Sequence, residues 1–276
     1  MGPQRFVTLR FVALRFIAAS SVAASLFTAA AAFADENNGP IITDRPTDGT
    51  GPLVLAPGRL QLESGYRVAE TDRRGGSAYS HLAPDLLIRK GLSERLELRA
   101  YVPGWVQETG NGSASGFSDI TIGTKIHLAD EDGLRPQSGV LIEAALPTGS
   151  NDVTADYVIP KALFLGTHTL NNVWSVTYNL GPSFITKRID GNRDERIEWN
   201  YAIGAAGALE GGVTVFAEVF GAAVDDGRFN DRRSLQVGAT WLRNNRLQFD
   251  ARIGGGLIDS DPDWFLGFGV SVFLDD

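Results

Sequence analysis

Apolar and polar residues alternate with a period of two along most of this chain, and this pattern is the strongest constraint on its fold. In residues 95–102 every second residue is apolar, from Leu96 to Val102, while Glu97 and Arg99 lie between them. Successive side chains of a strand point to opposite faces of a sheet, so the pattern predicts strands with one apolar and one charged face. Amphipathic helical periodicity is hard to find after the first 34 residues.

About twelve such segments follow one another, each about ten residues long. Their centres lie near residues 63, 85, 98, 122, 142, 163, 179, 202, 218, 237, 251 and 269. Short connections, such as 90–94 and 169–172, alternate with longer polar ones, such as 69–79, 104–116 and 187–195. This alternation is typical of a transmembrane barrel whose two ends both lie in the periplasm. The sequence therefore predicts an all-β fold, a single antiparallel transmembrane β-barrel of about 12 strands with both termini periplasmic.

A soluble β-sandwich is the competing prediction, because its strands would alternate as well. A sandwich turns its polar face to water and fills the space between its sheets with bulky apolar groups. Here the polar face mixes charged residues with small ones, as at Ala202, Gly204 and Ala206. Such a face suits a polar lumen better than an outer surface, so the barrel is preferred.

The first 34 residues have the features of an export signal. Arg5, Arg10 and Arg15 form a positive leading region, residues 16–33 are uncharged and rich in alanine, and residues 32–34 form a small-x-small cleavage motif. An uncleaved membrane anchor is the alternative, although alanine is only weakly hydrophobic. The predicted division is a cleaved signal peptide at 1–34, an N-terminal periplasmic segment at 35–58 and the transmembrane β-barrel at 59–276.

Charge and composition narrow the classes of function. The whole chain carries a formal charge of −8, and removal of three arginines with the signal leaves −11. Nucleic acid is therefore an improbable partner. Cysteine is absent, so neither disulfides nor thiolate metal sites are available. After residue 34 no apolar run approaches the roughly 18 residues of a membrane helix, and a chain that crosses lipid without helices must do so as a closed barrel.

The charged face of the strands supplies the candidate functional residues, because it would line the lumen. The lumen-lining candidates are Glu63, Arg67, Glu97, Arg99, Lys125, Glu143, Lys161, Glu198, Glu218, Asp250 and Arg252. They could line a path for solutes, or they could pair with one another in a structural salt-bridge network, since buried charges are normally paired. If acidic groups outnumber basic ones along the pore, cations should pass more readily than anions.

Catalytic and metal-binding patterns are weak in this sequence. The three histidines, His81, His127 and His168, fall on different predicted strands, and none belongs to a Gly-x-Ser-x-Gly or His-Glu-x-x-His motif. We therefore assign no catalytic residues, no metal site and no cofactor. A Ser-His pair formed across neighbouring strands stays open, because such sites are defined by geometry.

Several short motifs occur in the order in which one known family carries them. They are Asp44-Arg45-Pro46, Pro57-Gly58 followed by Gln61, Glu63, Gly65 and Tyr66, Gly91-Leu92 followed by Glu97, Leu98 and Arg99, Gly116-Phe117-Ser118-Asp119, Leu146-Pro147-Thr148-Gly149, and the closing segment from Asp250 to Phe273. The chain resembles the outer-membrane barrels named for the MetA pathway of phenol degradation. One departure is the carboxyl end, where Phe273 is followed by three more residues although such barrels commonly end on an aromatic residue.

The resemblance implies a protein of the Gram-negative outer membrane that takes up or exports small compounds, aromatic or hydrophobic ones among them. The expected partners are outer-membrane lipid, a small-molecule solute and the barrel-assembly machinery, with no nucleic acid. Three hypotheses follow: a passive transporter or channel, a non-conducting structural or surface-interaction barrel, and, less favoured, a membrane-embedded lipid-modifying enzyme.

Overall fold

The computed structural model describes residues 39–73, 76–110, 113–189, 192–224 and 231–274. The predicted signal peptide lies outside these ranges. Among the residues that are described, no helix is long and apolar enough to cross a membrane. The only helical element in them is a three-residue 3-10 turn, Glu210–Gly212.

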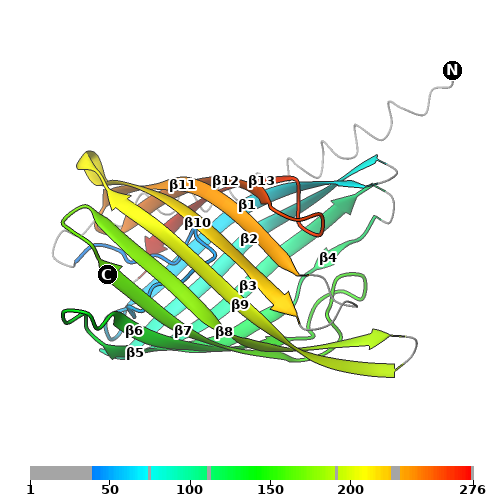
Figure 1. Ribbon diagram of the computed structural model, residues 1–276, viewed down its shortest axis with the longest axis horizontal. Helices are drawn as coiled ribbons and strands as arrows, with labels where there is room; N and C mark the ends of the chain where they lie inside the picture. Colours follow the sequence, from blue (N-terminus) through cyan, green and yellow to red (C-terminus); the bar gives the residue numbers. More distant parts are fainter. Residues whose placement is uncertain (1–38, 74–75, 111–112, 190–191, 225–230, 275–276) are drawn as a thin grey trace, which may run out of the picture.

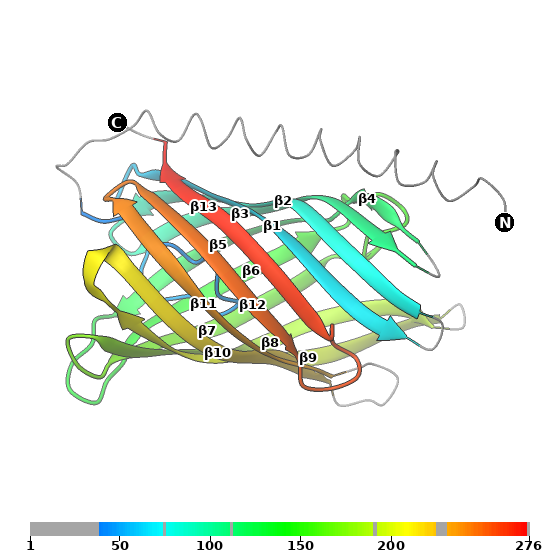
Figure 2. The ribbon, with the colours of Figure 1, turned by 90° about the horizontal axis from the view of Figure 1, so that it is seen from above.

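Long antiparallel strands wind around a common axis and form the whole wall of the molecule (Figures 1 and 2). The strands are β1 (Leu60–Arg73), β2 (Gly76–Ser93), β3 (Leu96–Thr109), β4 (Ser115–Phe117), β5 (Ile120–Ala129), β6 (Gln137–Leu146), β7 (Ile159–Thr169), β8 (Trp174–Ile189), β9 (Asn192–Ala208), β10 (Val213–Val224), β11 (Arg232–Asn244), β12 (Leu247–Gly256) and β13 (Trp264–Phe273). Each pairs with its sequence neighbour, except that β3 pairs with both β4 and β5.

The sheet closes on itself because β1 pairs with β13, with Gln61 opposite Phe273, and β2 pairs with β3. β4 is a three-residue piece beside β3, so the closed wall has 12 spanning strands, as predicted from the alternation. Closure gives each of these spanning strands a partner on both sides, which is what a structure in lipid requires. Each of the twelve predicted centres falls within one of the spanning strands.

The two ends of the barrel differ. At the turn end, where β1 begins and β13 ends, strands are joined by short connections such as 170–173 and 245–246. At the loop end the connections include 147–158 and 257–263. Three segments expected to be external loops, 69–79, 104–116 and 187–195, are instead mostly strand, because β1–β2, β3–β4 and β8–β9 extend into them. Polar residues in a strand that reaches beyond the apolar belt look like a loop in the sequence.

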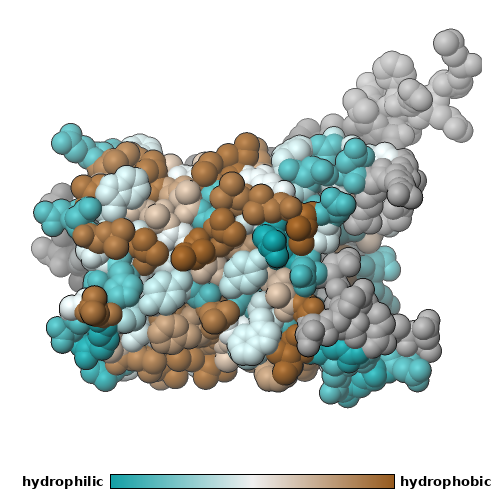
Figure 3. All heavy atoms as spheres, viewed as in Figure 1, coloured by the Kyte–Doolittle hydropathy of each residue, from teal (hydrophilic) through white to brown (hydrophobic). Residues whose placement is uncertain are grey.

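Polarity is inverted relative to a water-soluble protein. Outward-facing residues such as Ile142 and Ile203 are 48% and 54% exposed, whereas Glu97 and Lys125 have no exposed surface. Apolar residues cover the middle of the outer face and hydrophilic ones gather toward both ends (Figure 3). A soluble sandwich has the opposite arrangement, with its polar face outside. The strands of this protein alternate as those of a sandwich would, but their apolar face is the outer one. The apolar belt fits the hydrocarbon of a membrane.

A charge placed on this belt should block assembly. Ile142 is near the middle of β6, and Ile142→Arg should destabilise the folded barrel by about 2–4 kcal/mol, the cost of arginine facing lipid near the midplane. Urea titration of the barrel in lipid vesicles, read by heat-modifiable gel migration, measures the loss. Leu134→Arg is the control, because Leu134 precedes the same strand in a connection and is 97% exposed. Equal stability of the two variants would contradict the lipid-facing assignment.

The N-terminal segment lies inside the barrel. The sequence predicts a periplasmic segment at 35–58 that precedes the barrel, whereas the described part, 39–58, folds into the lumen from the turn end and returns there to start β1 (Figures 1 and 2). It begins where the backbone N–H of Ile41 donates to the carbonyl of Asn245, and leaves where Gly58 bonds with Gly91. The physical reason is that the charged inner wall needs polar partners that its own strands only partly supply.

Candidate functional site

Carboxylates of the wall hold the backbone of the N-terminal segment. Glu63 on β1 accepts hydrogen bonds from the backbone N–H groups of Asp44 and Arg45 at 2.8–3.2 Å. Glu218 on β10 accepts from Asp48 and Gly49 at 2.9 and 2.8 Å. These bonds satisfy donors that an irregular segment would otherwise bury without partners.

Two further wall residues also bind backbone groups of the N-terminal segment. Glu97 on β3 accepts a hydrogen bond from the backbone N–H of Leu55 at 2.9 Å. Asn179 on β8 both accepts from the N–H of Thr50 and donates to its carbonyl, at 2.7 and 2.9 Å. Because β3 and β8 lie on different sides of the barrel, the segment is anchored across the width of the lumen.

Asp44 is the centre of the largest ionic cluster. Its carboxylate binds the ammonium of Lys125 at 2.9 and 3.0 Å and the guanidinium of Arg99, and Arg89 approaches it to 3.6 Å. Arg89 also makes two bonds to Glu97, each 2.8 Å long, and one to Glu63 at 2.8 Å. All six side chains are at most 6% exposed. Opposite charges therefore neutralise one another in the turn-end half of the lumen.

Arg45 bridges two strands on another side of the lumen. Its guanidinium donates to Asp85 on β2 at 2.9 Å and to Asp250 on β12 at 3.3 and 3.4 Å. It lies over Gly65 and Gly269, which face each other across β1 and β13. A Cβ atom at either glycine would come within 2.2–2.6 Å of the guanidinium, so only glycine leaves room for it.

Asp48 is the last charged residue of the N-terminal segment, and it contacts two strands of the wall. Its carboxylate accepts from Arg252 on β12 at 2.7 Å and from Gln236 on β11 at 3.2 Å. Arg252 also donates to the carbonyl of Pro46 at 2.7 Å. Asp48 thus lies at the boundary between the filled half of the lumen and the open half.

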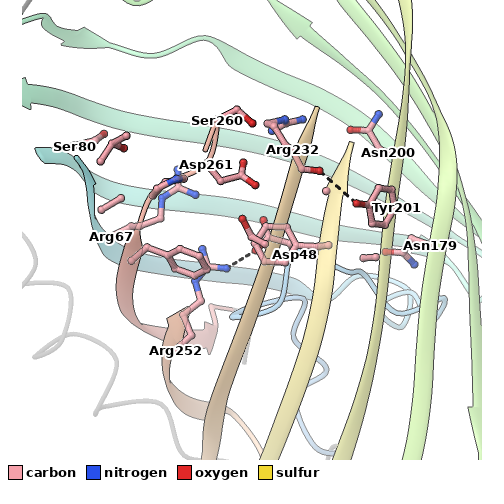
Figure 4. Close-up of a pocket in the computed structure, with 18 of the residues that line it drawn as sticks. Asp48, Arg67, Ser80, Asn179, Asn200, Tyr201, Arg232, Arg252, Ser260 and Asp261 are labelled. Atoms are coloured by element: carbon pink, nitrogen blue, oxygen red, sulfur yellow. Dashed lines mark hydrogen bonds and ion pairs between the residues drawn. The ribbon is translucent and has the colours of Figure 1, made fainter. Parts of the chain in front are cut away.

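A cavity of about 440 Å³ occupies the loop-end half of the lumen (Figure 4). Its charged lining comprises the basic residues Arg67, Lys161, Arg232 and Arg252 and the acidic residues Asp48, Glu108 and Asp261. Tyr201, Phe220 and Phe265 add aromatic surface. A smaller cavity of about 150 Å³ lies beside residues 44–50, and Arg67 and Arg252 line both. Basic residues outnumber acidic ones in the larger cavity, so the condition for a cation preference is not met there.

The structure places the eleven sequence candidates in two groups. Seven contact the N-terminal segment: Glu63, Glu97, Arg99, Lys125, Glu218, Asp250 and Arg252. The other four are nearer the loop end: Glu143 pairs with Lys161 at 2.8 Å, Glu198 pairs with Arg232 at 2.5 Å, and Arg67 lines the cavities. Whether any of them lines a path for solute stays a prediction.

Sequence reasoning missed the partners of these candidates. Asp44, Arg45 and Asp48 lie in a segment without periodicity, and the Asp-Arg-Pro motif marked only the first two. Arg89 was hidden because Leu86, Leu87 and Ile88 form a continuous apolar run that conceals the alternation. A buried arginine at the end of such a run is the signal that could have revealed it.

The three histidines lie apart from one another, as their positions on different predicted strands indicate. Tyr66 bonds with His81 at 2.7 Å, His127 with Asp130 at 3.0 Å, and His168 with Glu131 at 3.6 Å. Within the described part of the chain, no group of three or more His, Asp or Glu side chains is arranged to hold a metal ion.

Comparison with known proteins identifies the family. The sequence model of the family described as "Putative MetA-pathway of phenol degradation" matches residues 43–274. The chain belongs to this family. The match begins at Thr43, so this family's pattern includes the lumenal segment as well as the strands. No curated protein matches the chain in sequence.

Solved structures share the fold of this family member. An outer membrane channel from Pseudomonas putida F1 has a TM-score of 0.66 at 15% identity, over 83% of this chain and 100% of that one. The NanC porin has a TM-score of 0.52 at 9% identity, over 77% and 98%. The translocator domain of the autotransporter NalP from Neisseria meningitidis has 0.51 at 14% identity, over 80% and 90%. At these identities the likeness concerns the barrel architecture.

Proposed function

We propose that this protein is a passive channel of the Gram-negative outer membrane for small molecules. The observation that carries the proposal is the closed barrel with inverted polarity: its outside is apolar, and its inside contains a polar cavity of about 440 Å³. A wall of this kind fits a membrane, and a polar interior fits the passage of solutes. The P. putida protein of the same fold is an outer membrane channel, and the family's name suggests aromatic compounds as solutes.

The proposed orientation puts the turn end in the periplasm. Short turns and both chain ends are at the periplasmic side of such barrels, and longer connections face the exterior. The 440 Å³ cavity would then open toward the outside, and residues 39–58 would occupy the periplasmic half. Contact with membrane lipid and with the barrel-assembly machinery belongs to the same proposal, which includes no catalytic step.

A non-conducting structural barrel is the second candidate, and one observation favours it. The N-terminal segment is anchored across the lumen by buried ion pairs and backbone hydrogen bonds. A segment held this firmly could close the barrel permanently. The two candidates therefore differ in one measurable property, which is conductance.

Single-channel recording of the refolded mature chain in a planar bilayer tests the proposal. We expect small discrete conductance steps, and Arg232→Glu should alter their size or ion selectivity because Arg232 lines the cavity. Arg135→Glu is the control, since Arg135 lies in the connection between β5 and β6 and its side chain is 57% exposed. A folded protein, verified by heat-modifiable migration, that gives no steps would favour the structural barrel.

A further inference from the structure

We propose that the loop-end cavity is a binding site for small aromatic carboxylates, with Arg67 as the residue that receives the carboxylate. The inference deepens the proposed channel function and rests on it, because it names the class of solute that the lumen selects. The argument depends on which charges are already paired, on how two arginines are placed, and on where the aromatic surface lies.

Three of the four basic residues of the cavity already have acidic partners. Lys161 binds Glu143 at 2.8 Å, Arg232 binds Glu198 at 2.5 Å, and Arg252 binds Asp48 at 2.7 Å. The guanidinium of Arg67 makes neither a hydrogen bond nor an ion pair with any residue that the structure describes, although the charges of Asp85 and Asp48 attract it from farther away. The guanidinium of Arg67 therefore keeps its donors for a ligand.

The carboxylates nearest in this part of the lumen are already engaged. Asp85 accepts from Arg45 at 2.9 Å and from the hydroxyl of Tyr101 at 2.5 Å. Asp48, the other carboxylate that attracts Arg67, accepts from Arg252 at 2.7 Å. Asp85 and Asp48 attract Arg67 without bonding to its guanidinium, so an anion from solution can still accept its hydrogen bonds.

Strand register places Arg67 and Arg252 on either side of a glycine. Gly267 on β13 is opposite Arg67 on β1 and also opposite Arg252 on β12. Neighbouring strands are about 4.8 Å apart, so the two arginine Cα atoms are separated by about 10 Å. Glycine adds no side chain between them, and both guanidinium groups border the same space, as Figure 4 shows with Asp48 beside them.

Aromatic surface begins one step closer to the loop end. Phe265 on β13 is opposite Ala69 and Gly254, and both of these partners are small. Its ring meets that of Phe220 edge to face, with centroids 6.2 Å apart, and Arg252 lies 5.8 Å from its centre. A ligand whose carboxylate contacts Arg67 can thus place an apolar ring against Phe265.

The chemistry selects an anion with a ring over its neutral counterpart. The guanidinium fork matches a carboxylate in a bidentate geometry and stays charged at every relevant pH. The cavity volume is within the range of about 300–1,000 Å³ found for small-molecule sites. A neutral hydrocarbon would offer no acceptor to the guanidinium of Arg67, whereas an aromatic carboxylate satisfies both the cation and the apolar wall.

Isothermal titration of the full mature chain in detergent tests this site with three probes: benzoate, its neutral counterpart benzamide, and acetate, which lacks the ring. We expect benzoate to bind more tightly than either of the others. Arg67→Gln should weaken benzoate binding about tenfold or more, the worth of a hydrogen bond to a charged group, and leave benzamide unchanged. Arg67→Lys should fall between, because it keeps the charge without the fork.

Arg135→Gln is the matched control, since it removes an arginine far from the cavity. Equal affinities for benzoate and benzamide, or an unchanged benzoate affinity in Arg67→Gln, would overturn the proposal. Because Arg67 holds no other side chain in place, its loss should not prevent folding, and heat-modifiable migration checks this. Titration measures binding and does not depend on transport through the barrel. Binding without conductance would reject the channel and retain the binding site. Conductance without binding would reject the binding site and retain the channel.

Discussion

Replacing residues 41–55 by a glycine-serine sequence of equal length should increase the single-channel conductance severalfold. The native segment fills the turn-end half of the lumen through contacts to β1, β3, β8, β10 and β12. A barrel of 12 strands lies between the filled eight-stranded kind and the open sixteen-stranded porins. A glycine-serine sequence lacks the charged side chains through which Asp44, Arg45 and Asp48 bind the wall, so it should leave the wall, and water and ions should fill the interior.

The variant should still form a barrel, because the wall keeps its own hydrogen bonds and part of its ionic network. Arg89 remains paired with Glu63 and Glu97, and water can solvate Arg99 and Lys125 once the lumen is open. Planar-bilayer recording measures the effect, and the same replacement of residues 130–136, a connection at the turn end, is the control. Unchanged conductance in the lumenal variant would mean that residues 41–55 do not limit the pore.

Local periodicity was sufficient to predict the wall. Glu97 and Arg99 follow a rule that depends only on their immediate neighbours, since adjacent strand residues point to opposite faces. The twelve strands, their order and the inward direction of charge follow from that rule together with closure in lipid. The ends of strands were harder, as 69–79 and 187–195 illustrate, because polar residues beyond the membrane occur equally in strands and loops.

The filled half of the lumen could not be predicted in this way. Arg45 contacts Asp250, 205 residues away along the chain, and Asp44 contacts Lys125, 81 residues away. No periodicity connects such pairs, and the segment 39–58 has none of its own. An excess of buried charge on the predicted inner face is the one clue, since charges in a narrow lumen need partners. That clue shows that a partner exists without showing where in the chain it lies.

Asp44→Ala should destabilise the folded protein more than any other single loss of charge in the lumenal segment. It leaves Arg99 and Lys125 buried without the carboxylate that they share, and breaking a buried ionic interaction from one side costs about 3–5 kcal/mol. The urea midpoint of unfolding in lipid vesicles should therefore fall, and it should fall less in Asp44→Asn, which keeps a hydrogen-bond acceptor.

Asp130→Ala is the matched control for this loss, because Asp130 also pairs with a basic side chain, His127, yet is 87% exposed. Pairs in contact with water contribute little, so its midpoint should hardly move. The double variant Asp44→Ala/Lys125→Met separates the two contributions to the cost. If the penalty comes from an orphaned buried cation, removing Lys125 as well should restore part of the stability. Additive losses would instead mean that the pairing of Asp44 with Lys125 contributes no stability beyond the separate effects of the two side chains.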